Sequence, residues 1–179
     1  MDRRTMMTKT LLGKALIDML KEQDIHKISI RELCQRADVN RSTFYKYYGS
    51  QYDLLDDIEN RFVDKILEIL KENAEKKDYF KAMKSLLLLL NEDIEMARLI
   101  HIIKPNASFF SKIISAIDAE RDVYAEIHDI PEHLKPQVYN FYKIGAYRII
   151  CGWIAKEDRS NIDEVANLLL EMRKRLYKI

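Results

Sequence analysis

Apolar side chains recur every three or four residues along almost the whole chain, which is the spacing of one face of an α-helix. The first such stripe consists of Leu12, Ala15, Leu16, Met19 and Leu20. Lys14, Asp18 and Glu22 fall between these positions and face away from them. The pattern predicts an amphipathic first helix that ends near Asp24.

Two short helices are predicted after the first. Ser29 is followed three residues later by Glu32, a capping-box pattern that marks a helix start. After a break, Asn40 is expected to cap a third helix through its side-chain oxygen. In that helix Phe44 and Tyr48 lie four residues apart, so they share one face and are expected to pack on the first two helices.

A long helix is predicted next. Gly49 suits a left-handed residue after the third helix, and Ser50 to Asp53 has the pattern of another helix start. Apolar residues at helical spacing then continue to about Lys76.

The rest of the chain is also predicted to be helical. Candidate helices cover about residues 79–90, 91–103, 107–128, 131–156 and 162–177. Asn161 to Glu164 has a further capping-box pattern. The fold class is therefore all-α with about nine helices, divided into a three-helix head, residues 1–50, and a helical-bundle body, residues 51–179.

Composition supports the helices, and charge distinguishes the head. Four Gly and three Pro are few for a β-rich fold of 179 residues. Residues 1–50 carry ten Lys or Arg against six Asp or Glu, whereas residues 51–100 carry eight against twelve. A basic head on an acidic body is typical of a modular nucleic-acid binder.

The stretch Val39 to Tyr48, VNRSTFYKYY, contains no acid. A helix in a DNA groove runs between phosphates, which would repel carboxylates on its outer face. Three short helices with a tight turn form a helix-turn-helix, whose third helix can enter the major groove. Arg41 can reach a guanine edge or a phosphate, and Ser42 and Thr43 can contact base edges. Phosphate contacts are expected from Tyr45, Lys46 and Tyr47.

These residues resemble a known family. Residues 29–55, SIRELCQRADVNRSTFYKYYGSQYDLL, are similar to the DNA-binding signature of TetR/AcrR transcriptional regulators, and TKTLLGKALIDMLKEQ is similar to that family's first helix. The resemblance implies a ligand-responsive, homodimeric repressor that reads a palindromic operator in double-stranded DNA. Gln51 stands where the family often has a phosphate-binding Lys. The expected DNA contacts are Lys9, Ser29, Arg41, Ser42, Thr43, Tyr45, Lys46, Tyr47 and Gln51.

Residues 141–172 are similar to the last two helices of the family, which dimerise. Independently, Gly145 and Gly152 share one face of a predicted helix, where each costs about 1 kcal/mol relative to Ala. Close packing against another helix would explain them, either within the chain or across a dimer interface. The expected dimer residues are Gly145, Gly152, Trp153, Leu168 and Met172.

The resemblance also implies an effector pocket in the body for a small apolar or aromatic molecule. Apolar and aromatic residues there are its expected walls, although most such residues must form the core. The candidate lining residues are Met83, Leu87, Ile103, Phe109, Phe110, Ile113, Tyr139 and Tyr142.

Other function classes find little support. No nucleophile–base pair, glycine-rich phosphate loop or metal-ligand spacing is present, so we expect no enzyme activity, cofactor or metal site. The acids Asp56, Asp57 and Glu59 are expected to form a solvated helix face.

Two distant cysteines and the lack of a signal or membrane span indicate a cytoplasmic protein with no membrane association. The alternative function is a helical adaptor or co-activator that acts mainly through a protein partner.

Overall fold

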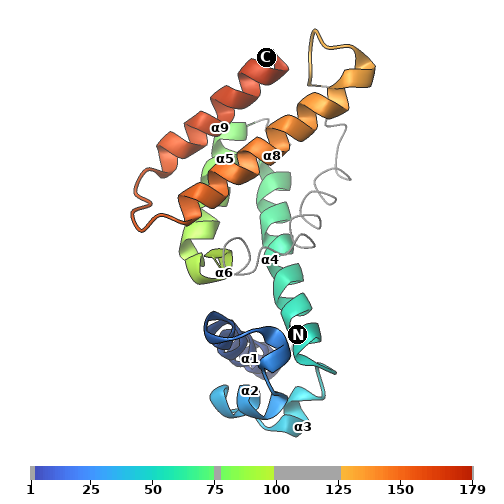
Figure 1. Cartoon of the computed structure of the whole chain (residues 1–179), viewed down its shortest axis with the longest axis vertical. Coiled ribbons are helices and arrows are strands. Elements are labelled where there is room, and N and C mark those ends of the chain that lie inside the picture. The colour runs from blue at the N-terminus through green and yellow to red at the C-terminus, as the bar shows by residue number, and fades with distance from the viewer. Residues whose placement is uncertain (1–2, 75–77, 99–125, 179) are drawn as a thin grey trace. The chain divides into compact units, whose positions relative to one another are not determined.

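The computed structural model describes residues 3–74, 78–98 and 126–178 (Figure 1). Throughout these ranges the regular elements are helices and there is no strand, which confirms the predicted all-α class. Most of the helix expected over residues 107–128 lies outside the described residues. So do four of the expected pocket residues, namely Ile103, Phe109, Phe110 and Ile113.

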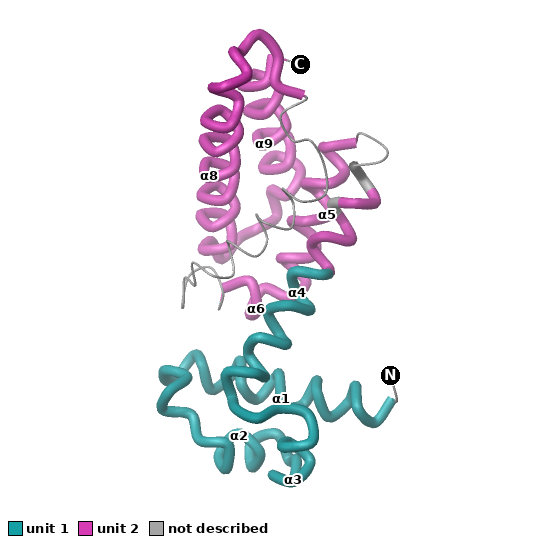
Figure 2. The backbone as a smooth tube through the Cα atoms, turned by 90° about the vertical axis from the view of Figure 1, so that its right-hand side faces the viewer, with its two compact units in different colours: residues 1–64 teal, residues 65–179 magenta. Residues whose placement is uncertain are grey.

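The chain forms two compact units, residues 1–64 and residues 65–179 (Figure 2). The boundary lies within helix α4, Gln51–Ala74. The first unit therefore contains the expected head together with the first turns of α4. The functional division after residue 50 stays a prediction.

The first unit contains α1 (Arg3–Glu22), a 3-10 turn (Ile25–Lys27), α2 (Ile30–Arg36), α3 (Arg41–Phe44) and the start of α4. Its core is built from the predicted apolar stripes, because one face of each helix is buried against the others. The most deeply buried side chains are Leu12, Leu16, Leu20, Ile28, Leu33, Phe44 and Leu54. Each contributes about 2 kcal/mol through removal of apolar surface from water.

The start of α2 confirms the predicted capping box. The Ser29 hydroxyl accepts a hydrogen bond from the Glu32 amide, and the Glu32 carboxylate accepts one from the Ser29 amide. Both bonds satisfy amides that would have no partner at a helix N-terminus.

The start of α3 differs from the prediction. Asn40 is the N-terminal flanking residue, but its side chain makes no capping bond to α3. The backbone begins the helix instead, since the Asn40 carbonyl accepts from the amides of Thr43 and Phe44. Only Arg41–Phe44 is α-helical, and turns continue through Tyr47.

The prediction of a left-handed Gly49 is wrong, because no glycine has a positive φ in the described chain. The left-handed residue is Asp38, with φ of 53°, in the turn between α2 and α3. Gly49 has a different role. A Cβ there would lie 3.0 Å from the Asp53 carboxylate, whose Oδ2 accepts from the Gly49 amide at 2.9 Å.

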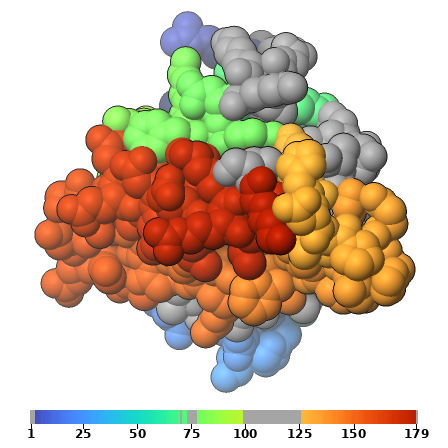
Figure 3. All heavy atoms as spheres, turned by 90° about the horizontal axis from the view of Figure 1, so that it is seen from above, coloured from blue at the N-terminus to red at the C-terminus, as the bar shows by residue number. Residues whose placement is uncertain are grey.

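The second unit contains α5 (Tyr79–Glu92), α6 (Ile94–Arg98), a 3-10 turn (Glu132–Leu134), α8 (Lys135–Ile154) and α9 (Ile162–Tyr177). Helix α9 packs against both α5 and α8, and Figure 3 shows these helices side by side. Leu87, Leu90, Trp153 and Leu169 are buried between them.

The start of α9 also departs from the prediction. The Asn161 side chain does not cap the helix but accepts a hydrogen bond from the Trp153 indole at 3.1 Å. The acids Asp163 and Glu164 in the first turn still favour this helix end, because the N-terminus carries partial positive charge. None of the described helices has the length and apolar character needed to span a bilayer.

Candidate nucleic-acid interface

The segment Arg41–Tyr47, which we call the reading segment, alternates between exposed and buried side chains. Arg41, Ser42, Tyr45 and Lys46 are exposed, as the sequence predicts. Thr43 and Tyr47 are half-buried. The outer side of this segment therefore presents a guanidinium, an ammonium and hydroxyl groups without a carboxylate.

Two aromatic rings hold the reading segment on the head. Phe44 is fully buried, and Tyr48, directly after the segment, is buried beside it with ring centroids 5.6 Å apart. Tyr45 stands edge-on to Phe44 at 5.5 Å while 51% of its surface stays exposed. Its hydroxyl is thus supported by the core yet available to an external acceptor.

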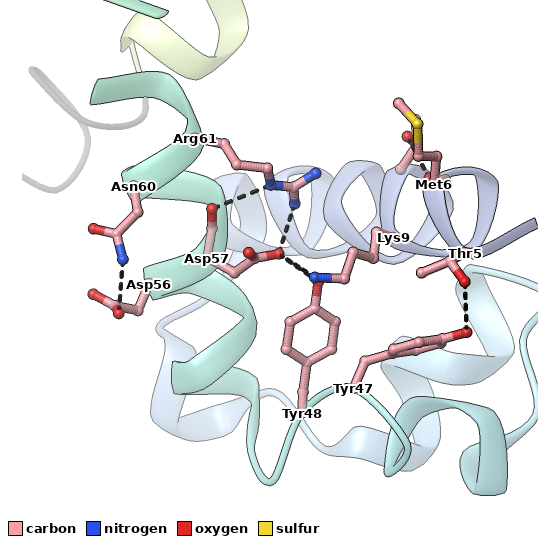
Figure 4. A network of polar contacts seen from close by, with 10 residues as sticks. Thr5, Met6, Lys9, Tyr47, Tyr48, Asp56, Asp57, Asn60 and Arg61 are labelled. Atoms are coloured by element: carbon pink, nitrogen blue, oxygen red, sulfur yellow. Dashed lines mark hydrogen bonds and ion pairs between the residues drawn. The ribbon is translucent and has the colours of Figure 1, made fainter. Parts of the chain in front are cut away.

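Tyr47 is tied to the first helix. Its hydroxyl lies 3.3 Å from the Thr5 hydroxyl of α1, within hydrogen-bonding distance (Figure 4). A phenol can donate one bond and accept another, so this contact leaves capacity for a phosphate.

Lys9 belongs to α1, and its side chain reaches Asp57 of α4. Its ammonium is 3.4 Å from the Asp57 carboxylate and 5.2 Å from the centroid of the Tyr48 ring. Only 18% of the Lys9 side chain is exposed. Because an ammonium has three N–H donors, Lys9 can contact a phosphate while it stays beside Asp57.

The remaining expected DNA contacts, Ser29 and Gln51, already have partners within the head. The Ser29 hydroxyl belongs to the capping box and donates to Glu32 at 2.7 Å. The Gln51 side-chain amide donates to the Ile25 carbonyl at 3.4 Å, a long bond. At the same helix start, the Asp53 carboxylate accepts from the Gly49 and Ser50 amides.

Sequence reasoning missed Asp57. The expectation of a solvated face at Asp56, Asp57 and Glu59 is wrong for two of the three, because Glu59 is buried and Asp57 is half-buried with charged partners. The four-residue spacing of Asp57 and Arg61 was the sequence feature that could have predicted their ion pair.

Burial raises the pKa of the Tyr48 hydroxyl, and the hydrogen bond to Asp57 raises it further, so this hydroxyl stays a hydrogen-bond donor.

Comparisons with known proteins bear on the head most strongly. The family model of the bacterial regulatory proteins, tetR family, matches residues 14–58, which lie within the first compact unit. Over these residues the chain is similar to the TetR family of bacterial regulatory proteins. The match includes the reading segment and the start of α4.

Two curated relatives of this chain are regulators by name. The HTH-type dhaKLM operon transcriptional activator DhaS of Lactococcus lactis subsp. lactis (strain IL1403) is 32% identical over 88 residues, which is 49% of this chain and 44% of DhaS. The uncharacterized HTH-type transcriptional regulator YxbF of Bacillus subtilis (strain 168) is 25% identical over 92% of this chain and 44% of YxbF. The chain thus spans less than half the length of these relatives.

Two solved structures share the fold. A TetR transcriptional regulator from Streptococcus agalactiae 2603V aligns with a TM-score of 0.67 and 22% identity, and the dihydroxyacetone kinase operon activator DhaS aligns with a TM-score of 0.61 and 20% identity. Each alignment covers 96% of both chains. The TetR-like fold therefore extends beyond the head into the body.

The body packs two of its expected pocket tyrosines into a core. Tyr139 is buried in a cluster with Ile127 and Tyr177, and Tyr142 packs against that cluster. The Tyr142 hydroxyl donates to the Leu169 carbonyl at 3.3 Å. Leu87 is also buried, and Met83 is half-buried.

An open groove of about 370 Å³ lies along α8, α9 and the connection between them. Three of the expected dimer residues, Gly152, Trp153 and Leu168, contribute to its lining. Trp153 is otherwise buried, Leu168 is exposed and Met172 is half-buried. No group of three or more potential metal ligands occurs in the part of the chain that the structure describes.

The two α8 glycines face open space. A Cβ added to Gly145 or Gly152 would meet no described atom within 4 Å other than the adjacent residues and nearby backbone of α8 itself. Packing inside the described part of the body therefore does not explain why these positions lack a side chain.

Proposed function

We propose that this chain is a transcriptional regulator that binds double-stranded DNA through the reading segment. The observation that carries the proposal is the outer side of that segment, which presents Arg41, Tyr45 and Lys46 without a carboxylate. The match to the TetR family model over residues 14–58 supports the same assignment.

Each exposed group has a chemical role in this proposal. Arg41 contacts a guanine edge or a phosphate, and Ser42 and Thr43 contact base edges in the major groove. Tyr45, Lys46 and Tyr47 donate to phosphate oxygens and fix the register of the helix. Lys9, Ser29 and Gln51 lie at the flanks and contribute smaller phosphate contacts.

The active form is proposed to be a homodimer joined through α8 and α9. Phe141 is 67% exposed, and Ile144 and Leu168 are about half exposed, an unusual set of apolar groups to leave in water. Gly145 and Gly152 would let a second copy approach the α8 backbone closely. A dimer can place two reading segments in successive major grooves, about 34–36 Å apart.

The dimer has its own test. Phe141→Glu puts a charge on the proposed interface and is expected to raise the dissociation constant of the dimer at least tenfold, as measured by sedimentation. Asn140→Glu, at an exposed neighbouring position, is the control. Equal association of the two variants would contradict the α8 interface.

Control by a small apolar or aromatic effector in the body is part of the proposal. The body residues Met83, Leu87, Tyr139 and Tyr142 are the described candidates for its contacts. An effector changes DNA affinity only through different affinities for the two states of the protein. Repression is the expected outcome. Activation is the second candidate, because the relative that is 32% identical is named an activator.

DNA binding is tested by fluorescence anisotropy with mixed-sequence and genomic duplexes at two salt concentrations. A DNA binder shows affinity that falls steeply with salt, by several phosphate equivalents, and a sequence-specific fraction. A helical adaptor that acts through a protein partner shows little of either.

The reading segment is tested by Arg41→Ala and Tyr45→Ala. Each is expected to weaken specific binding roughly 10- to 100-fold, because each removes a contact to a base or phosphate. Both residues are exposed, so the thermal midpoint and the dimer should be retained. Lys21→Ala, which removes a charge from the exposed end of α1, is the control. Unchanged affinity in the Arg41 and Tyr45 variants would refute this segment as the reader.

A further inference from the structure

One carboxylate oxygen in the first unit, that of Asp57 in α4, connects three parts of the chain. Asp57 Oδ2 accepts a hydrogen bond from the Tyr48 hydroxyl at 2.6 Å (Figure 4). The same atom lies 3.0 Å from the Arg61 guanidinium and 3.4 Å from the Lys9 ammonium. The partners come from α4 itself, from α1 and from the residue directly after the reading segment.

The Tyr48 bond is the one that reaches the reading segment. The Tyr48 ring is buried against Phe44, and a phenylalanine could fill the same space. The hydroxyl adds a short, charge-assisted bond that sets the distance between the end of the reading segment and α4. The Tyr48 amide also donates to the Phe44 carbonyl, so a shift of Tyr48 is passed directly to the segment.

Lys9 and Arg61, the two cations beside Asp57, each make a second contact. The Lys9 ammonium lies over the Tyr48 ring as well as beside Asp57, which joins α1 to the same point. Arg61 also donates from Nε to the Asp57 carbonyl at 3.2 Å, so its guanidinium is oriented by two bonds. The carboxylate is only 28% exposed and is surrounded by groups that stabilise its charge.

We propose that Asp57 is a positioning residue for DNA recognition: it orients the reading segment through Tyr48 and holds α1 through Lys9, without touching the DNA. This inference rests on the proposed function. Asp57 is needed for sequence-specific binding even though it adds a negative charge to a surface that faces a polyanion.

Whether DNA binding weakens or tightens when Asp57 is removed distinguishes a positioning role from a purely electrostatic one. If Asp57 were only a nearby charge, its removal would lessen repulsion and release Lys9 and Arg61 for phosphates, and DNA binding would tighten. If Asp57 positions the reading segment, specific binding weakens despite the gain of one positive charge. Asp56 provides the matched control, since it is adjacent on α4, exposed, and accepts a hydrogen bond from Asn60.

The experiment uses the full chain and two duplexes of equal length. One is selected by the wild-type protein from a random pool, and the other is a shuffled version of it. The ratio of their dissociation constants measures recognition, whereas a change in the folded fraction alone would alter both constants equally. The variants are Asp57→Asn, Asp56→Asn, Tyr48→Phe and Arg41→Ala.

We expect Asp57→Asn and Tyr48→Phe each to lower the ratio about tenfold, the effect of losing a hydrogen bond to a charged group. Binding of Asp57→Asn to the shuffled duplex should be unchanged or tighter. Asp56→Asn should leave the ratio unchanged. Asp57→Glu, which keeps the carboxylate, should recover part of the ratio that Asp57→Asn loses.

The proposal is overturned if Asp57→Asn retains the wild-type ratio, or binds the selected duplex as tightly as Asp56→Asn does. Should Asp57→Asn fail to fold, Tyr48→Phe decides alone, because it keeps the buried ring, and an unchanged ratio in that variant overturns the proposal. Failure of the proposed function has a separate signature: Arg41→Ala then leaves both dissociation constants unchanged, or no sequence is selected from the pool.

Discussion

The two compact units each place a charged group where several elements meet, but they stabilise it differently. In the first unit the group is the Asp57 carboxylate, which is partly exposed, accepts a hydrogen bond from a hydroxyl and pairs with two cations. In the body it is the Arg173 guanidinium of α9, which is 3% exposed. Arg173 pairs with Glu126 and lies 3.6 Å from the centroid of the Tyr79 ring.

The difference follows from desolvation. A guanidinium removed from water requires a carboxylate and aromatic faces to offset the cost of burial, and Tyr79 and Tyr177 supply those faces. The Asp57 contacts keep some water, so they cost less to form and are screened more by salt. Nearby phosphates can therefore perturb the Asp57 contacts, whereas the Arg173 contacts are shielded from solvent where α5, α9 and the segment before α8 meet.

The chain offers a separate reporter for each unit. Its single tryptophan, Trp153, is buried in the body, so its fluorescence follows body unfolding. Cys34 is buried in the head and Cys151 is half-buried in the body, so thiol labelling resolves the two units. These reporters allow each prediction to be assigned to one region.

The largest effect is expected from Phe44→Ala. Phe44 is fully buried, and its truncation should destabilise the head by about 4 kcal/mol through lost burial and a cavity. Accelerated labelling of Cys34 in denaturant measures the loss. Destabilisation in the Trp153 transition instead would contradict the division into two units.

Arg173→Met should destabilise the body by about 3 kcal/mol, because Glu126 keeps its charge without its partner. The measurement is denaturant unfolding followed by Trp153 fluorescence. Addition of Glu126→Gln should restore part of the stability. Lys174→Met, at the exposed neighbouring position, is the control and should change little.

Removal of one hydroxyl in each unit should have smaller, similar effects. Tyr48→Phe loses the bond to Asp57, and Tyr79→Phe loses the bond to Glu126. Each change should cost about 1–2 kcal/mol, seen by Cys34 labelling for the first and by Trp153 for the second. A loss in only one of the two variants would show that one of these bonds adds nothing to folding.

The smallest expected effect concerns the native thiols. Burial raises the pKa of both Cys34 and Cys151, so less thiolate is present at neutral pH than in a free cysteine. Alkylation of the native protein, followed by mass spectrometry, should be slow at pH 7 and faster at pH 9. Cys34 should react later than Cys151 because it is more deeply buried; the reverse order would contradict the packing of α2.

Several features of the fold and the interface follow from local pattern. The helical spacing of apolar residues predicts the all-α class, and the Ser29 and Glu32 pair predicts the start of α2. The four-residue spacing of Phe44 and Tyr48 predicts which side of the third helix is buried, and hence that Arg41 is exposed. Such features depend on backbone periodicity and on contacts within one turn, which neighbouring residues determine.

Caps and partners outside one turn could not be predicted in the same way. Asn40 and Asn161 have capping residue types, yet neither side chain caps, and Asn161 bonds to Trp153 instead. Gly49 leaves room for the close approach of the Asp53 carboxylate and does not have a left-handed backbone. In each case a neighbour in space determined which of several locally acceptable conformations forms.

By itself, the sequence determined the helices, the apolar face of each, and an acid-free surface suited to phosphates. Only the tertiary structure decided that Asp57 would meet Lys9 and Tyr48, and that Arg173 would lie between two rings. The physical reason is range: helix periodicity arises within a few residues, whereas the partners of a charged side chain are chosen by which helices pack together.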